Sequence, residues 1–209
     1  MALRFPETDP STPARQRMES FASANLGERI APFSETKSRL DGRGMLFWVS
    51  MHQDERLLRK GADNIRWLSA AMPQNANSGH PGGSMGGADF AHLLYSEYLV
   101  YDPKDPFWKE RDRFFLDPGH MSAMLYATLA VSGKYTTSDL AAFRQWGSHT
   151  PGHPEHDVAH GVENTSGPLG QGHVFGVGAA VAERFLAARF GEWLTHKTWV
   201  YISAGGIQE

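Results

Sequence analysis

The chain has 209 residues, of which 41% are hydrophobic and 21% charged, a composition typical of a globular protein that can bury a core. Its formal net charge of -3 excludes the dense positive surface with which proteins bind nucleic acid or anionic membranes. The absence of cysteine excludes disulfides, thiolate zinc sites and a cysteine nucleophile. Neither an apolar run of membrane-spanning length nor a signal peptide is recognisable, so we expect a cytoplasmic protein.

Residues 1–50 differ in pattern from the rest of the chain. Four prolines, mixed charges and no sustained hydrophobic period predict a poorly ordered leader. Acidic residues balance its arginines, which argues against a transit peptide. We therefore expect the folded domain to span residues 51–209, with Met51 as an alternative start and Glu209 as either a natural end or a point inside a longer protein.

The regular pattern begins with a helix. Apolar residues at helical spacing predict a helix that begins at Asp54 and is stopped by Pro73. A glycine-rich turn follows, and residues 90–98 are expected to form a second helix. The apolar run over 113–116 then predicts a short buried strand.

Two further helices are expected over 121–131 and 138–146, the second capped by Thr137 or Ser138. Near the end of the chain, residues 197–202 predict a second buried strand. Strands alternating with helices and polar turns are typical of an open parallel sheet, whose ligands lie beyond the carboxyl ends of the strands. We therefore predict an α/β fold with an incomplete parallel sheet flanked by helices.

Glycine-rich and proline-rich turns carry the candidate chemistry. The turn over 164–172 precedes an amphipathic helix over 173–190, and its backbone N–H groups are expected to point forward unpaired, toward an anion or a cofactor edge. Three other turns each hold an imidazole, namely His80, His120 and His153. Histidine is suited to proton transfer near neutral pH, although histidines in turns are often only hydrogen-bonded polar groups.

A metal site is an alternative explanation for a second group of histidines. His156 and His160 are four residues apart and would share one face of a helix. Prolines and a glycine in the same stretch break the helix that such a site needs, which argues against it. The full group is His149, His153, His156 and His160.

Four motifs together resemble the transketolases, which depend on thiamine diphosphate. They are NSGHPG at 77–82, ERDRFFLDPGH at 110–120, FRQWGSHTPGHPE at 143–155 and ENTSGPLGQG at 163–172. Their order and spacing match the first part of the family's N-terminal, diphosphate-binding domain. The resemblance implies a thiamine-diphosphate-binding fold and a homodimer with Mg²⁺. The implied reaction moves a two-carbon ketol unit from a ketose phosphate to an aldose phosphate, in the non-oxidative pentose phosphate pathway.

The resemblance also implies residue roles. His80 would contact the sugar near its reacting carbons, and His153 the hydroxyl of the transferred unit. His120 would lie beside the cofactor diphosphate, and Arg144 near the substrate phosphate. The loop that holds the aminopyrimidine through backbone contacts would be Gly167, Pro168 and Leu169.

The metal turn departs from the family pattern. Where relatives carry Gly-Asp-Gly or Ser-Asp-Gly-Gly, this chain has Ser203-Ala204-Gly205-Gly206. Gly205 keeps its expected place beside the cofactor, but the methyl group of Ala204 replaces the carboxylate that ligates Mg²⁺ and offers no ligand. We therefore expect this chain alone to bind thiamine diphosphate weakly or not at all.

Two hypotheses follow for the whole. In the first, the chain is the leading piece of a transketolase, active when the missing domains or a partner chain complete it. In the second, it is a truncated, non-catalytic relative that acts as an interaction module on a transketolase-type partner. Either way, an unfinished sheet exposes a strand edge and an apolar face, so we expect the isolated chain to aggregate readily.

Overall fold

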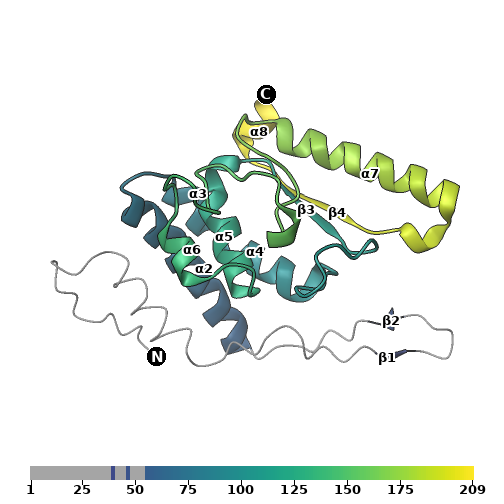
Figure 1. The fold of residues 1–209 in the computed structure, drawn as a ribbon, viewed down its shortest axis with the longest axis horizontal. Coiled ribbons are helices and arrows are strands. Elements are labelled where there is room, and N and C mark those ends of the chain that lie inside the picture. The colour runs from purple at the N-terminus through teal and green to yellow at the C-terminus, as the bar shows by residue number, and fades with distance from the viewer. Residues whose placement is uncertain (1–38, 41–45, 48–54) are drawn as a thin grey trace.

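The computed structural model describes residues 39–40, 46–47 and 55–209 (Figure 1). The first two ranges are the strands β1 (Arg39–Leu40) and β2 (Leu46–Phe47), which pair in an antiparallel manner. The predicted disorder of the leader and the alternative start at Met51 otherwise fall outside the described residues. Among the described helices, none combines the length and apolar character that crossing a membrane requires.

A layer of helices forms most of the core. Its longest member is α2 (Glu55–Ala76), which packs against α3 (Pro81–Gly86), α4 (Ala88–Leu93) and α5 (Ser122–Val131). The sequence of α5 is small or apolar on all sides, and eight of its residues are buried. A helix without a polar face belongs in the interior, so α5 lies at the centre of the layer.

Two parallel strands lie beside this layer. β3 (Arg113–Leu116) pairs in parallel with β4 (Thr198–Tyr201), and Arg113 is opposite Thr198. β3 places Phe114 and Leu116 in the core of the helical layer, while α7 (Gln171–Phe190) contacts both strands. Figure 1 shows the strand pair between the helices and α7. This arrangement confirms the predicted α/β fold with a small, incomplete parallel sheet.

The prediction that Pro73 stops the first helix is wrong. α2 continues through Pro73 to Ala76, and the proline is buried against Gly79 and Phe143. A proline in the last turn removes only one helical hydrogen bond, and its carbonyl still accepts the N–H of Ser78 at 3.0 Å. Burial of the ring against the core therefore offsets a small local loss.

The expected cap and end of the helix over 138–146 also need correction. α6 spans Thr137–Ala141, and its cap is Thr136, which forms a reciprocal capping box with Asp139. The helix ends early because Arg144 adopts the left-handed region at a φ of 61°. The glycine turn after α2 differs as well, because Pro81 begins the short helix α3. The chain over 90–98 forms the end of α4 and a π-helical segment, η2 (Leu94–Tyr98).

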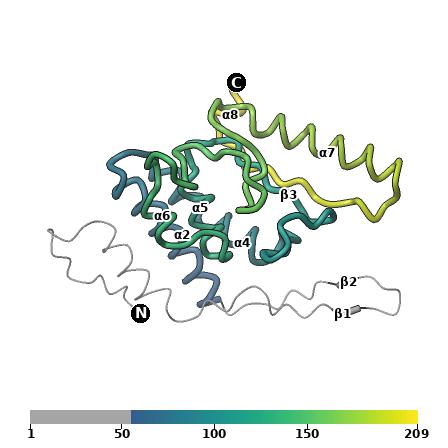
Figure 2. The backbone as a smooth tube through the Cα atoms, viewed as in Figure 1, coloured from purple at the N-terminus to yellow at the C-terminus, as the bar shows by residue number. Residues whose placement is uncertain are grey.

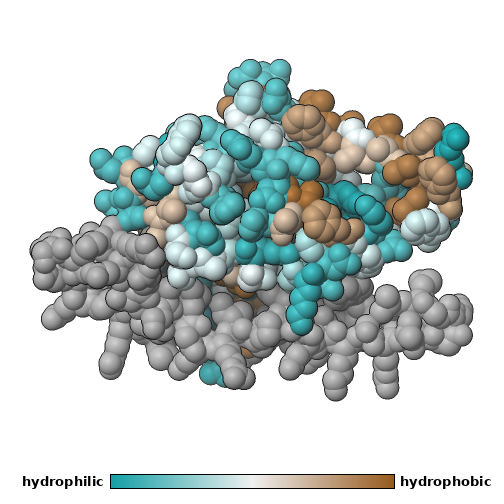
Figure 3. All heavy atoms as spheres, in the orientation of Figure 1, coloured by the Kyte–Doolittle hydropathy of each residue, from teal (hydrophilic) through white to brown (hydrophobic). Residues whose placement is uncertain are grey.

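The long helix α7 stands apart from the helical layer (Figure 2). It packs on the strands through the residues around Gly172 and Gly176, and most of its large apolar side chains face outward. Figure 3 shows hydrophobic side chains gathered over this helix. The exposed members are Val174, Phe175, Val177, Val181, Phe185, Leu186 and Phe190. An apolar face is therefore left uncovered by the described residues, but it lies on α7 and not on the unfinished sheet for which such a face was predicted.

Candidate active site

The carboxylate of Asp117 organises the carboxyl end of β3. This side chain is fully buried and accepts the backbone N–H of Gly170 at 2.9 Å. His173 Nδ1 lies 3.3 Å from the same carboxylate, and the hydroxyl of Ser166 donates to the Asp117 carbonyl at 2.9 Å. The loop before α7 is thus tied to the end of the strand.

This contact corrects one expectation. The N–H of Gly170 is not free for a ligand, because Asp117 accepts it. The sequence reasoning overlooked Asp117, since an aspartate before Pro-Gly is a common turn residue. Its position directly after a buried strand was the available signal.

Gly172 and Gly119 lie where another segment approaches too closely to leave room for a Cβ. A Cβ on Gly172 would lie 2.3 Å from the Cα of Asp117, and one on Gly119 would lie 2.7 Å from the hydroxyl of Ser166. The loop over 166–170 therefore packs directly on the turn that carries His120. On the opposite side, a Cβ on Gly167 would meet nothing within 4 Å, so this part of the loop faces open space.

The structure brings the three turn histidines together. The rings of His80 and His120 make an edge-to-face contact with their centroids 5.1 Å apart. Burial lowers the pKa of His120, and the neighbouring imidazoles of His80 and His153 lower it further. The pKa of His153 is also lowered, first by partial burial and then by the charge of Arg144 and the nearby imidazole of His80. His120 and His153 are therefore mostly uncharged at neutral pH.

Helix α5 holds the turn that carries His153. The hydroxyl of Ser122 donates to the carbonyl of Gly152 at 2.7 Å, and the hydroxyl of Tyr126 donates to the carbonyl of Pro151 at 2.9 Å. Because both donors belong to a buried helix, they fix the backbone of the two residues that precede His153. The imidazole thus rests on a rigid support.

A cleft of about 980 Å³ opens beside this turn and is lined by Ser78, Arg144 and His153. Arg144 Nη1 donates to the hydroxyl of Ser78 at 2.9 Å, so the guanidinium bridges two motifs that are distant in the sequence. The left-handed backbone of Arg144 directs it there, and its N–H bonds to the carbonyl of Thr150 at 3.0 Å. A cation and an imidazole in one cleft suit a phosphorylated polar ligand.

The turn after β4 tests the fit to the family's cofactor. Ser203 caps α8 (Ala204–Gln208) by accepting the N–H of Gly206 at 3.1 Å, and Ala204 contributes only a methyl group. The carboxylate next to Gly206 is Asp117, whose oxygens already bond to the loop before α7. The donors of this turn therefore do not fit Mg²⁺, which prefers several hard oxygen ligands.

The residues predicted to contact the organic part of the cofactor lie close to one another. A Cβ on Gly205 would lie 3.2 Å from Leu169, so the two predicted cofactor contacts adjoin each other across the strand ends. Gly167 lies on the open side of the same loop, next to Pro168 and close to the turn of His120. The predicted residues therefore form one surface.

Comparison with known proteins identifies the family. The family model described as "Transketolase, thiamine diphosphate binding domain" matches residues 58–209. The chain is 44% identical to transketolase-1 of Arabidopsis thaliana, a chloroplastic protein, over 89% of this chain and 26% of that protein. It is 49% identical to the transketolase of Buchnera aphidicola, over 73% and 24% respectively.

Solved structures agree. The transketolase of Leishmania mexicana superposes with a TM-score of 0.68 and 44% identity, over 73% of this chain and 23% of that one. The transketolase of Campylobacter jejuni gives a TM-score of 0.70 and 41% identity, over 75% and 25%. The chain thus spans about a quarter of the length of these relatives. It belongs to the transketolase family and corresponds to part of its thiamine diphosphate binding domain.

Proposed function

We propose that this chain supplies the first part of a transketolase active site. The completed protein would transfer a two-carbon ketol unit from a ketose phosphate to an aldose phosphate. The observation that carries the proposal is the convergence of His80, His120 and His153 beside the loop over 166–170. Homodimer formation, a cytoplasmic location and a place in the non-oxidative pentose phosphate pathway belong to the same proposal and rest on family membership.

Each candidate site residue has a distinct role in this proposal. When bound, thiamine diphosphate supplies the carbon nucleophile for the transfer. His153, uncharged because burial lowers its pKa, accepts a hydrogen bond from a sugar hydroxyl and can take its proton. His80 contacts the sugar from the facing turn, and Arg144 holds its phosphate. His120 contacts the diphosphate, while Gly167, Pro168 and Leu169 hold the pyrimidine through the backbone.

Ala204 limits what this sequence can do with the cofactor. The family's metal ligand at this position is replaced by a methyl group, and Asp117 is committed to the loop. We therefore expect weak binding of thiamine diphosphate even when the remaining domains are present. Restoring the carboxylate should raise cofactor affinity at least about tenfold, the scale on which metal sites respond to their surroundings.

A chimaera tests both points. Residues 58–209 would replace the matching part of the Buchnera aphidicola transketolase, with Ala204 or with Ala204→Asp. We expect the Ala204→Asp form to bind thiamine diphosphate at least about tenfold more tightly and to be the form that shows ketol transfer. A further His153→Gln change should lower its kcat by about 100-fold or more. Equal cofactor affinity of the two forms would show that the metal argument is wrong. Unchanged kcat after His153→Gln would refute the role of that imidazole.

A second candidate is a non-catalytic interaction module. Two observations favour it, namely the methyl group of Ala204 and the exposed apolar side of α7. An apolar helix face of this size is typical of a protein interface. In this case the 209-residue chain should form a saturable complex with a transketolase in sedimentation velocity. A chain that sediments alone, or only as aggregates, contradicts the module.

A further inference from the structure

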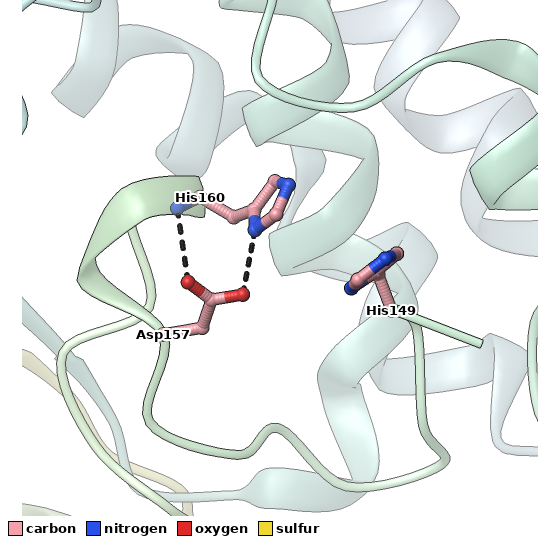
Figure 4. Close-up of side chains that lie close together, drawn as sticks. All are labelled: His149, Asp157 and His160. Atoms are coloured by element: carbon pink, nitrogen blue, oxygen red, sulfur yellow. Dashed lines mark hydrogen bonds and ion pairs between the residues drawn. The ribbon is translucent and has the colours of Figure 1, made fainter. Parts of the chain in front are cut away.

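Three side chains outside the histidine cluster of the active site meet at the rim of the cleft (Figure 4). They are His149, Asp157 and His160, and one donor atom from each lies within 4.8 Å of the other two. His160 Nδ1 is 2.6 Å from Asp157 Oδ2, and the ring of His149 lies 5.2 Å from that of His160. Figure 4 shows that His149 comes from one segment and the other two residues from another.

A tight turn positions Asp157 and His160. Asp157 and Val162 exchange two backbone hydrogen bonds of 2.9 Å, and Gly161 closes the turn at a φ of 89°. The ring of His160 stacks on buried Tyr135, with centroids 5.0 Å apart and planes 22° from parallel. Two of the three donors are therefore held in place before any ligand arrives.

From the sequence, a metal site at these histidines is disfavoured because prolines and a glycine break the helix that would carry it. The helix is indeed absent, and residues Val158–His160 form a short 3-10 turn instead. That turn brings His160 next to Asp157, a residue that the histidine pattern did not include. His156 is exposed, and its backbone N–H bonds to the hydroxyl of Thr165. Two of the four histidines, His149 and His160, thus share a cluster with a carboxylate, whereas His156, the i, i+4 partner of His160, is not part of it.

We propose that His149, Asp157 and His160 form a binding site for a divalent transition-metal ion, with Zn²⁺ as the best fit. Two imidazoles and one carboxylate form a donor set that zinc accepts and that Mg²⁺ and Ca²⁺ disfavour. Zinc bonds of about 2.0–2.2 Å in tetrahedral geometry place neighbouring donors roughly 3.4 Å apart. The present separations need only small shifts, and His149 is exposed and able to move. The cation takes the place of the proton shared by His160 and Asp157.

The three donors belong to the loop between α6 and α7, whereas Ala204 begins α8. His149 and Asp157 both line the cleft, so a fourth coordination position is open to water. A bound ion would also join the two ends of the segment over 149–157, which contains His153. Such a cross-link lowers the freedom of the loop and stabilises the folded state. Zinc binding at these three side chains does not require the proposed catalytic activity.

The test uses the 209-residue chain, freed of metal by a chelator and titrated with Co²⁺ as a spectroscopic probe for zinc. Wild type should bind one Co²⁺ with visible absorption typical of four-coordinate nitrogen and oxygen ligands, and Zn²⁺ should displace it. His149→Gln and Asp157→Asn should each weaken binding by at least about tenfold. His156→Gln is the matched control, a neighbouring exposed histidine outside the cluster.

Stability provides a second measurement. Zn²⁺ should raise Tm in wild type and in His156→Gln and leave Tm unchanged in His149→Gln. His149 is exposed, so its replacement should leave the circular dichroism spectrum unaltered. The proposal is overturned if wild type shows no saturable Co²⁺ binding. It is equally overturned if His149→Gln and Asp157→Asn bind Co²⁺ as tightly as His156→Gln.

Discussion

The ion pair between Arg111 and Glu163 gives a sharp test of how the active-site loop is held. Glu163 begins the loop before α7, and Arg111 lies just before β3. The guanidinium donates two hydrogen bonds to the carboxylate, at 2.5 and 3.2 Å, and the two side chains are only 9% and 12% exposed. Glu163→Gln removes the negative charge at nearly constant volume and leaves a buried cation without its partner.

The expected cost follows from burial. Breaking a buried pair in this way typically costs about 3–5 kcal/mol. Arg111 keeps hydrogen bonds to the carbonyls of Pro106 and Asp112, so the lower value of about 3 kcal/mol is appropriate. At an m-value of about 2 kcal/mol/M, this loss lowers the urea midpoint by roughly 1.5 M.

Urea unfolding followed by circular dichroism measures this effect, and the chain contains a matched control. Arg59 and Glu55 form an ion pair with 76% and 77% exposed side chains. Glu55→Gln makes the same chemical change in water and should leave the urea midpoint almost unchanged. Equal midpoints for Glu163→Gln and Glu55→Gln would refute the reasoning that burial gives the first pair its importance.

Three further predictions concern stability. Gly172→Ala places a Cβ 2.3 Å from backbone at the end of β3 and should lower the free energy of unfolding by about 1–3 kcal/mol. Gly178→Ala in the same helix meets open space and should raise it by about 1 kcal/mol. Equal unfolding midpoints for the two variants would contradict the close approach at Gly172. Tyr126→Phe removes the hydrogen bond to Pro151 and should lower the free energy of unfolding by about 1 kcal/mol in chemical denaturation. Burial lowers the pKa of His92, so the unfolded chain binds more protons than the folded chain below about pH 6.5. The urea midpoint should therefore decrease as the pH is lowered from about 7.5 to about 5.5. A midpoint independent of pH would count against this.

Elements with long apolar patterns were predictable from the sequence. The strands β3 and β4 and the helices α5 and α7 lie within a few residues of their expected bounds, because each is a largely apolar run set off by turn residues. The end of α2 was not predictable in the same way, since the tolerance of Pro73 depends on its burial in the core. The cap of α6 was readable in principle, because only Thr136 places Asp139 three residues further on.

The site residues also divide into those that were predictable from the sequence and those that were not. The positions of His80, His120 and His153 followed from their motifs, and the structure shows that the three lie together. The roles of Asp117 and Asp157 could not be predicted from the sequence, because each depends on a contact that only the folded chain brings about. A carboxylate in a turn has many ordinary uses, and only the folded chain shows which partner it meets.

The pairing of β3 with β4 has a consequence for the order of folding. The strands join residues 113 and 198, whereas the helices of the layer, α2 to α5, contact one another across shorter separations in the chain. Contacts between distant segments carry a larger loop-closure entropy and tend to form late. The helical layer should therefore collapse first and β4 dock afterwards. Substitutions in β4 should then accelerate unfolding and leave the refolding rate almost unchanged, in contrast to substitutions in α5.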